Sequence, residues 1–132
     1  MAKIFSNSWK RSKQPRKQRL YNYNAPLHLR QKKLHVHLSP ELRKKYGFRQ
    51  IQLKKGDRVK VLRGQFAKKE GKVEKINLKQ EKVFVTGIEI IKKDGGKLPF
   101  ALLPAKLMIL ELDLGDKLRK EKLESKKIKT SK

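Results

Sequence analysis

The stretch KKGDRVKVLRGQFAKKEGKVEKI, residues 54–76, decides the fold of this chain. In DRVKVLRG two valines alternate with two basic residues, the period of two expected for a strand with one buried face. A basic segment from Arg63 to Glu70 follows, and Gly71 opens a second alternating run, GKVEKI. The stretch therefore predicts two strands joined by a basic loop.

Downstream of this stretch, further short apolar runs predict more strands. KVFVTGIEII (82–91) indicates a third strand and a fourth, and KDGGK (93–97) predicts a hairpin because Asp-Gly-Gly readily adopts positive φ. KLMILEL (106–112) is apolar on both faces, which is typical of a central strand that closes the fold. Four or five strands in about 60 residues predict a small β-barrel, because an open sheet would expose its edges to aggregation.

Upstream, the sequence predicts one strand and one helix. LHVHL (34–38) alternates apolar and polar residues. A short helix is expected near 39–46, with Ser39 as N-cap, Pro40 at the first helical position and Gly47 ending it in a left-handed turn.

Charge divides the chain into three parts. Lys and Arg number 37 against 12 Asp and Glu, a net charge of +25. Residues 1–50 carry +13 and form a predicted basic extension, and residues 51–112 carry +8 and form the predicted barrel. Residues 113–132 carry +4 and predict a marginal helix followed by a frayed, charged tail.

This charge indicates a polyanionic partner. Nucleic acid fits best because its phosphates are dense and the counterions they release favour binding; acidic membranes and acidic proteins are weaker alternatives. The chain has no cysteine, which excludes disulfides and thiolate sites. Residues 1–30 lack the apolar segment of a secretory signal and have the basic, acid-free composition of a transit peptide, but prolines interrupt the helix that such a peptide needs. Residues 98–112, the most apolar window, are too short and too interrupted to span a membrane.

The first part of the extension has the composition of an RNA-binding arm. WKRSKQPRKQRLYNY (9–23) interleaves basic residues with aromatic ones and contains no acid. Such a segment cannot order itself alone, but aromatic rings can stack on exposed bases while guanidinium groups pair with phosphates. A solvated, disordered tail is the alternative.

Residues 54–76 resemble the KOW motif of ribosomal proteins and of transcription elongation factors related to bacterial NusG. With SPELRKKYG before it and GIEIIKKDGGKLP after it, the chain is similar over most of its length to the universal KOW-domain family of the large ribosomal subunit, in its archaeal–eukaryotic form. The resemblance implies an SH3-like barrel that binds large-subunit ribosomal RNA near the nascent-chain exit, among neighbouring ribosomal proteins, and that acts early in subunit assembly. It implies neither a cofactor nor a small-molecule substrate, and it places the protein in the cytoplasmic ribosome.

Glycines beside lysines suit a phosphate-binding loop, because a backbone without Cβ allows close approach. Gly71 is expected either to have positive φ or to lie too close to a neighbour for a Cβ. Arg63, Lys68, Lys69 and Lys72 form a basic patch around these glycines. Lys54, Lys55 and Arg58 would extend this patch if the two loops lay at the same end of the barrel. The candidate RNA-binding residues are Arg11, Lys13, Arg16, Lys17, Arg19, Arg30, Lys32, Lys33, Arg43, Lys44, Lys54, Lys55, Arg58, Arg63, Gly64, Lys68, Lys69, Gly71 and Lys72.

Two segments depart from the family's pattern. Where the family often has a Lys-Gly pair, this chain has Ala67 and Lys68, so the loop is expected to turn differently and Lys68 is a weaker candidate than Arg63 or Lys72. LLPAK (102–106) matches the family's turn only loosely, and scaffold is expected there.

Neither a metal site nor a catalytic site is predicted. His35 and His37 share one face of a strand, but zinc needs three or four ligands and His28 is the only other histidine. Asp57 with an acid such as Glu70 or Glu74 is more typical of ion pairs and turns than of catalysis. An enzyme is therefore the least favoured class.

Two other nucleic-acid-binding classes compete with a ribosomal protein. An elongation factor would need an additional αβ domain before the KOW module. A general DNA-coating protein is disfavoured because a compact barrel with basic arms suits folded RNA better than a uniform duplex.

Overall fold

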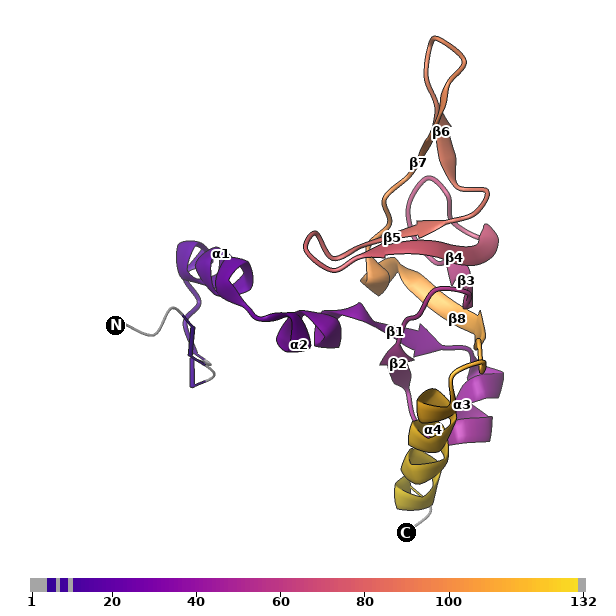
Figure 1. Ribbon diagram of the computed structural model, residues 1–132. Coiled ribbons are helices and arrows are strands. Elements are labelled where there is room, and N and C mark those ends of the chain that lie inside the picture. The colour runs from indigo at the N-terminus through magenta and orange to yellow at the C-terminus, as the bar shows by residue number, and fades with distance from the viewer. Residues whose placement is uncertain (1–4, 7, 10, 131–132) are drawn as a thin grey trace.

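A computed structural model describes residues 5–6, 8–9 and 11–130 of the chain, the last five of them by their backbone alone. Strands dominate the central part, and helices lie toward both ends (Figure 1). In chain order the elements are α1 (Pro15–Asn24), α2 (Leu27–Arg30), the 3-10 helix η1 (Gln31–Leu34), β1 (His35–Leu38), α3 (Pro40–Tyr46), β2 (Gln50–Gln52), β3 (Arg58–Val61), β4 (Glu70–Asn77), β5 (Lys82–Val85), β6 (Glu89–Ile91), β7 (Lys97–Pro99), the 3-10 helix η2 (Pro104–Lys106), β8 (Leu107–Glu111) and α4 (Lys117–Thr130).

Six strands form one mixed sheet in the order β2-β1-β8-β3-β4-β5. The β1–β8 pair is parallel and the other neighbours are antiparallel. The last strand, β8, lies between β1 and β3, so the prediction of a central closing strand is confirmed. Strand β1 lies within the predicted N-terminal extension and is nevertheless an inner strand of this sheet.

One face of the sheet forms the core. Alternate residues are buried along β3 and β8, as the period of two requires, while Met108 and Leu110 are half-buried on the other face. The core side chains are Val36, Leu38, Ile51, Leu53, Val59, Val61, Val73, Val83, Val85, Ile88, Leu102, Leu107, Ile109 and Leu123. Each such side chain contributes about 1.5–3 kcal/mol by leaving water.

The predicted mainly-β class is confirmed, but the sheet is not a closed barrel. Strands β2 and β5 form its two edges and do not pair with each other. The chain covers these edges instead. Val83 of β5 exchanges two backbone hydrogen bonds of 2.8 and 2.9 Å with Leu102, and a carbonyl of β2 accepts a hydrogen bond from α4. A closed barrel was expected because unpaired edge strands promote aggregation. Covering the two edge strands prevents aggregation as well.

The predicted hairpin is present as β6 and β7, which form a separate two-stranded sheet. Gly95 adopts φ +81° in its turn, where Lys92 and Gly96 are joined by a backbone hydrogen bond of 2.8 Å. The hairpin projects from the end of the main sheet (Figure 1). Its aliphatic side chains Ile90, Ile91 and Leu98 are 43%, 71% and 46% exposed.

The predicted short helix is α3. The Ser39 hydroxyl accepts a hydrogen bond from the Leu42 backbone amide at 3.4 Å, Pro40 opens the helix and Gly47 ends it at φ +76°.

The N-terminal arm contains more helix than the sequence analysis expected. Helix α1 extends away from the sheet (Figure 1). Its prolines do not interrupt it, because Pro15 occupies the first turn, where no amide is required, and Pro26 follows the last turn. Tyr21 stacks on Trp9 with ring centroids 4.7 Å apart.

The C-terminal segment is also more ordered than a marginal helix with a frayed tail. Helix α4 spans 14 residues and lies beside α3 (Figure 1). It buries Leu123 and Arg119, which are 2% and 4% exposed, while Leu118 on another face is 66% exposed. None of the described helices is long and apolar enough to cross a membrane.

Candidate nucleic-acid interface

The predicted basic loop connects β3 to β4 and is held by its own backbone. The Lys68 amide donates to the Val61 carbonyl at 2.8 Å, and the Val61 amide donates to the Lys69 carbonyl at 2.9 Å. Arg63, Lys68 and Lys69 are exposed. The backbone of the loop is therefore held in place, and its basic side chains extend from it into solvent.

Two residues of this loop adopt left-handed backbone. Gly64 has φ +107°, which suits glycine, and Lys68 has φ +70°, which residues other than Gly, Asn and Asp rarely adopt. Lys68 stands where the family often has glycine. A lysine at this φ carries backbone strain.

A ring contact fixes the loop against the base of the hairpin. The rings of Phe66 and Phe100 lie 5.0 Å apart, and Phe100 directly follows β7. The Lys69 amine lies 5.3 Å from the centre of the Phe66 ring, a cation–π contact that holds this amine near the loop. This contact was not predictable from a local pattern, since 34 positions separate the two phenylalanines in the chain.

Gly71 is required by close packing and not by positive φ. A Cβ at this position would lie 2.4 Å from the Thr86 carbonyl oxygen and 2.7 Å from Cγ1 of Val85. Of the two alternatives predicted for this glycine, the close approach is correct.

Arg58 and Lys72 are register partners on β3 and β4, so their side chains project from the same face of the sheet. Arg58 pairs with Glu111 at 3.0 Å and with Glu70 at 3.3 Å, and Lys60 reaches Glu70 at 3.6 Å. Lys72 is exposed. Carboxylates therefore hold the Arg58 side chain, whereas the neighbouring Lys72 side chain is free to contact a phosphate.

The β2–β3 turn does not extend the patch of the β3–β4 loop. The two connections lie at opposite ends of β3, separated by about 13 Å of strand at the usual rise per residue. Lys54, Lys55 and Arg58 were expected to share that patch only if the two loops lay at one end of the barrel, and they do not. Lys54 forms a hydrogen-bonded ion pair with Asp116. The hydrogen bond lowers the pKa of the Asp116 carboxyl below its ordinary value of 3.8.

The turn is instead the anchor of the C-terminal helix. Asp57 is fully buried, and both of its oxygens accept from the Arg119 guanidinium, at 2.6 and 2.7 Å. They also accept the Asp113 and Lys54 backbone amides, each at 2.8 Å. Arg119 donates further to the carbonyls of Asp113 and Gln52 at 2.8 and 3.2 Å. Of its nitrogens, only Nε is buried without a partner among the described residues.

The roles expected for Asp57 as turn former and ion-pair partner are thus both confirmed, whereas Arg119 was missed. One signal was available in the sequence: Arg119 and Leu123 are four residues apart and so share one face of a helix.

Several other predicted cations make internal contacts. Arg30 donates to the carbonyls of Ala25 at 2.9 Å and Lys79 at 3.3 Å, which joins the arm to the turn between β4 and β5. Lys33 pairs with Glu81 at 2.8 Å, and Arg43 donates to the Leu38 carbonyl at 2.8 Å.

The remaining candidates are exposed and, within the described part of the chain, have no side-chain hydrogen bond or ion pair. They lie on α1 and the segment before it, on η1 and α3, on the β2–β3 and β3–β4 connections and, for Lys72, in β4. These residues are Arg11, Lys13, Arg16, Lys17, Arg19, Lys32, Lys44, Lys55, Arg63, Lys68 and Lys72. Among the described residues, no three His, Asp or Glu side chains are grouped so that they could hold a metal ion.

Comparisons with known proteins cover most of the chain. Residues 12–126 match the family model described as the ribosomal proteins L26 of eukaryotes and their archaeal counterparts of the L24 type. The large ribosomal subunit protein uL24 of Methanothrix thermoacetophila is 50% identical over 105 residues, which cover 80% of this chain and 90% of that protein. The protein of the same name from Methanoculleus marisnigri is 49% identical over 112 residues, 85% of this chain and 93% of that protein.

Proposed function

The chain belongs to the family of ribosomal proteins that comprises L26 of eukaryotes and its archaeal counterparts, and we propose that it binds ribosomal RNA through the β3–β4 loop and the N-terminal arm. As a member of this family it is a structural, non-enzymatic constituent of the large subunit, and its place is the ribosome in the cytoplasm. The rival assignments, an elongation factor and a general nucleic-acid-binding protein, gain no support from these relatives.

The observation that carries the proposal is the contrast between a fixed loop backbone and unpaired cations on it. Arg63 and Lys68 form no ion pair among the described residues, whereas the backbone of their loop is held by hydrogen bonds and by the Phe66–Phe100 contact. Lys72 is also exposed and unpaired, but it lies in β4, opposite Arg58, and not in the loop. A preorganised cation loses little entropy when it meets a phosphate, so a charge-assisted contact there is worth more than one from a mobile tail.

The internal contacts divide the predicted RNA-binding residues into two groups. We propose that the unpaired cations contact phosphates, and that Arg30, Lys33, Arg43, Lys54 and Arg58 chiefly hold the fold. Each residue of the second group would have to give up an existing partner before it could bind RNA, which reduces its net gain.

The arm supplies a second contact region. Arg16, Lys17 and Arg19 are exposed on α1, and Tyr23 is 76% exposed. Cations and an exposed ring on a projecting helix suit unpaired RNA, since bases stack on aromatic side chains while phosphates meet the basic groups.

The proposal also includes protein neighbours within the subunit. The hairpin β6–β7 exposes three aliphatic side chains that nothing in the described chain covers. A two-stranded hairpin is marginal by itself, so contact with a neighbour would stabilise it. A place near the nascent-chain exit and a role in early assembly, which the resemblance implies, remain predictions.

A salt series tests the proposed function. Binding of the full chain to large-subunit ribosomal RNA fragments should weaken by about 10³–10⁵ between 50 and 200 mM salt if up to ten phosphates are neutralised. Duplex DNA of random sequence and equal length is the comparison, and it should bind more weakly at every salt concentration. Equal affinity for both polymers would contradict a ribosomal RNA site.

A further inference from the structure

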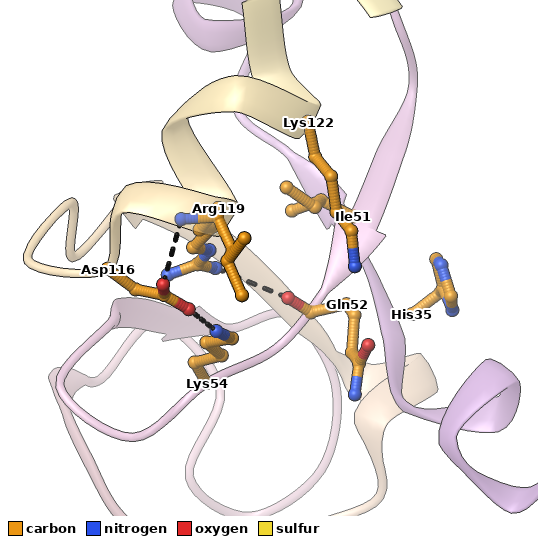
Figure 2. A pocket seen from close by; sticks show the side chains of 8 residues that line it. His35, Ile51, Gln52, Lys54, Asp116, Arg119 and Lys122 are labelled. Atoms are coloured by element: carbon orange, nitrogen blue, oxygen red, sulfur yellow. Dashed lines mark hydrogen bonds and ion pairs between the residues drawn. The ribbon is translucent and has the colours of Figure 1, made fainter. Parts of the chain in front are cut away.

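A hollow of about 470 Å³ lies between α4 and the edge of the sheet formed by β1 and β2 (Figure 2). Its volume is within the range of small-molecule sites. Apart from Lys54, none of the residues around it belongs to the predicted RNA-binding set. Figure 2 shows Lys122 extending from α4 toward Gln52, with Ile51 beside it and the Lys54–Asp116 pair on the other side.

The charges around the hollow leave one cation uncompensated. Lys54 is paired with Asp116, and Arg119 is paired with Asp57 beneath the surface. Lys122 lines the hollow, is exposed, and makes no ion pair within the described residues. One unpaired amine matches one phosphate group.

The polar groups beside that amine can both donate and accept. Nδ1 of His35 lies 2.7 Å from the Lys32 carbonyl, which can only accept, so Nδ1 carries a proton and Nε2 is left for a ligand. The Gln52 side chain offers a donor and an acceptor, because Arg119 uses only the backbone carbonyl of that residue. The edge of a nucleobase has both donors and acceptors and so matches the Gln52 amide, whereas a carboxylate can only accept.

The hollow also has apolar walls. Leu118 is 66% exposed, and Ile51, which is 8% exposed, lines the hollow from the sheet. Apolar walls can contact the flat faces of a base, as they do in pockets that hold an extruded base between aromatic or apolar side chains. A duplex is far too wide for a space of this volume.

From these features we propose that the hollow binds a single unstacked nucleotide of RNA, with its phosphate on Lys122 and its base edge on Gln52 and His35. This inference rests on the proposed function, because the nucleotide is part of the bound ribosomal RNA. It adds a third contact region on the opposite side of β3 from the basic loop, and it gives the C-terminal helix a role in recognition.

A pair of matched variants tests the site in the full chain. Lys122→Ala and Lys120→Ala each remove one positive charge from the same helix, but only Lys122 lines the hollow. For a ribosomal RNA fragment that binds the parent chain, Lys122→Ala should weaken affinity about tenfold and Lys120→Ala no more than about twofold, with unchanged thermal unfolding in both. Equal losses would overturn the site and leave the proposed function standing, whereas failure of the parent chain to bind would overturn the proposed function itself.

A direct titration identifies the ligand. Millimolar adenosine or uridine 5′-monophosphate should shift the NMR signals of the Ile51 methyl groups and the His35 ring, and inorganic phosphate at equal concentration should not. Gln52→Ala should abolish the shifts without loss of stability, since its backbone carbonyl is kept. Equal shifts with inorganic phosphate would show that the hollow binds only anions, which would overturn the proposal of a nucleotide site. The absence of any shift with either nucleotide would overturn it as well.

Discussion

Arg63 in the β3–β4 loop and Arg119 in α4 show two opposite uses of the same residue type. Arg63 is exposed and has no partner in the described chain, whereas Arg119 is 4% exposed and its two terminal nitrogens donate hydrogen bonds to Asp57, Asp113 and Gln52. With 12 acids for 37 basic residues, most cations of this chain have no carboxylate available. The comparison indicates that a cation paired with one of the few acids stabilises the fold, whereas an unpaired cation remains available to bind a polyanion.

Loss of Arg119 should have the largest effect on stability. Arg119→Met leaves Asp57 buried without its counter-charge and should lower the free energy of unfolding by about 3–5 kcal/mol, measured by denaturant titration. Lys120→Met, on the exposed side of the same helix, is the control and should change it by less than about 0.5 kcal/mol. An Arg119 variant as stable as the parent would show that the buried pair does not hold α4.

Gly71→Ala should have the next largest effect. Its Cβ would meet the Thr86 carbonyl at 2.4 Å, so strands β4 and β5 must shift, at a cost of about 1–3 kcal/mol. Gly64→Ala is the comparison, because its φ of +107° is strained for alanine but nothing lies within 4 Å of the new methyl group. It should cost about 1 kcal/mol. If Gly64→Ala proved the more destabilising in thermal unfolding, the close approach at Gly71 would not be the controlling feature.

A smaller effect, of opposite sign, is expected at Lys68. Lys68→Gly relieves a left-handed residue at φ +70° and should raise the free energy of unfolding by about 0.5–1 kcal/mol after the added freedom of the unfolded chain is allowed for. Lys68→Ala removes the same charge but keeps the strain, so it should bring no such gain. Equal stability of the two variants would show that the left-handed backbone is not the source of strain.

Local patterns predicted the elements that depend on neighbouring residues. The alternation in β3 and β4, the Asp-Gly-Gly turn of the hairpin, the Ser39 cap of α3 and the two-sided apolar run of β8 all involve positions close in the chain. Each of these signals depends on backbone geometry within a few residues, so it can be recognised in the sequence before the fold is known.

Long-range features were not predictable in this way. The Asp57–Arg119 pair joins residues 62 positions apart, and the cover of the β5 edge comes from Leu102, in a segment expected only to be scaffold. Without these contacts the sequence favoured a closed barrel and a frayed tail. For the candidate interface, composition identified the cations but could not predict which of them pair with an acid, because most of these acids are distant in the sequence.

The central claim is that the unpaired cations of the β3–β4 loop bind ribosomal RNA, and the comparison of Arg63→Ala with Arg58→Ala tests it most directly. Each variant loses one arginine, Arg58 from the first position of β3 and Arg63 from the loop that follows this strand, but Arg58 is already held by Glu70 and Glu111. In equilibrium binding to a large-subunit ribosomal RNA fragment at fixed salt, Arg63→Ala should weaken affinity about tenfold while its stability stays within about 0.5 kcal/mol of the parent. Arg58→Ala should weaken affinity clearly less. Parental affinity in the Arg63 variant, or a larger loss in the Arg58 variant, would contradict the account.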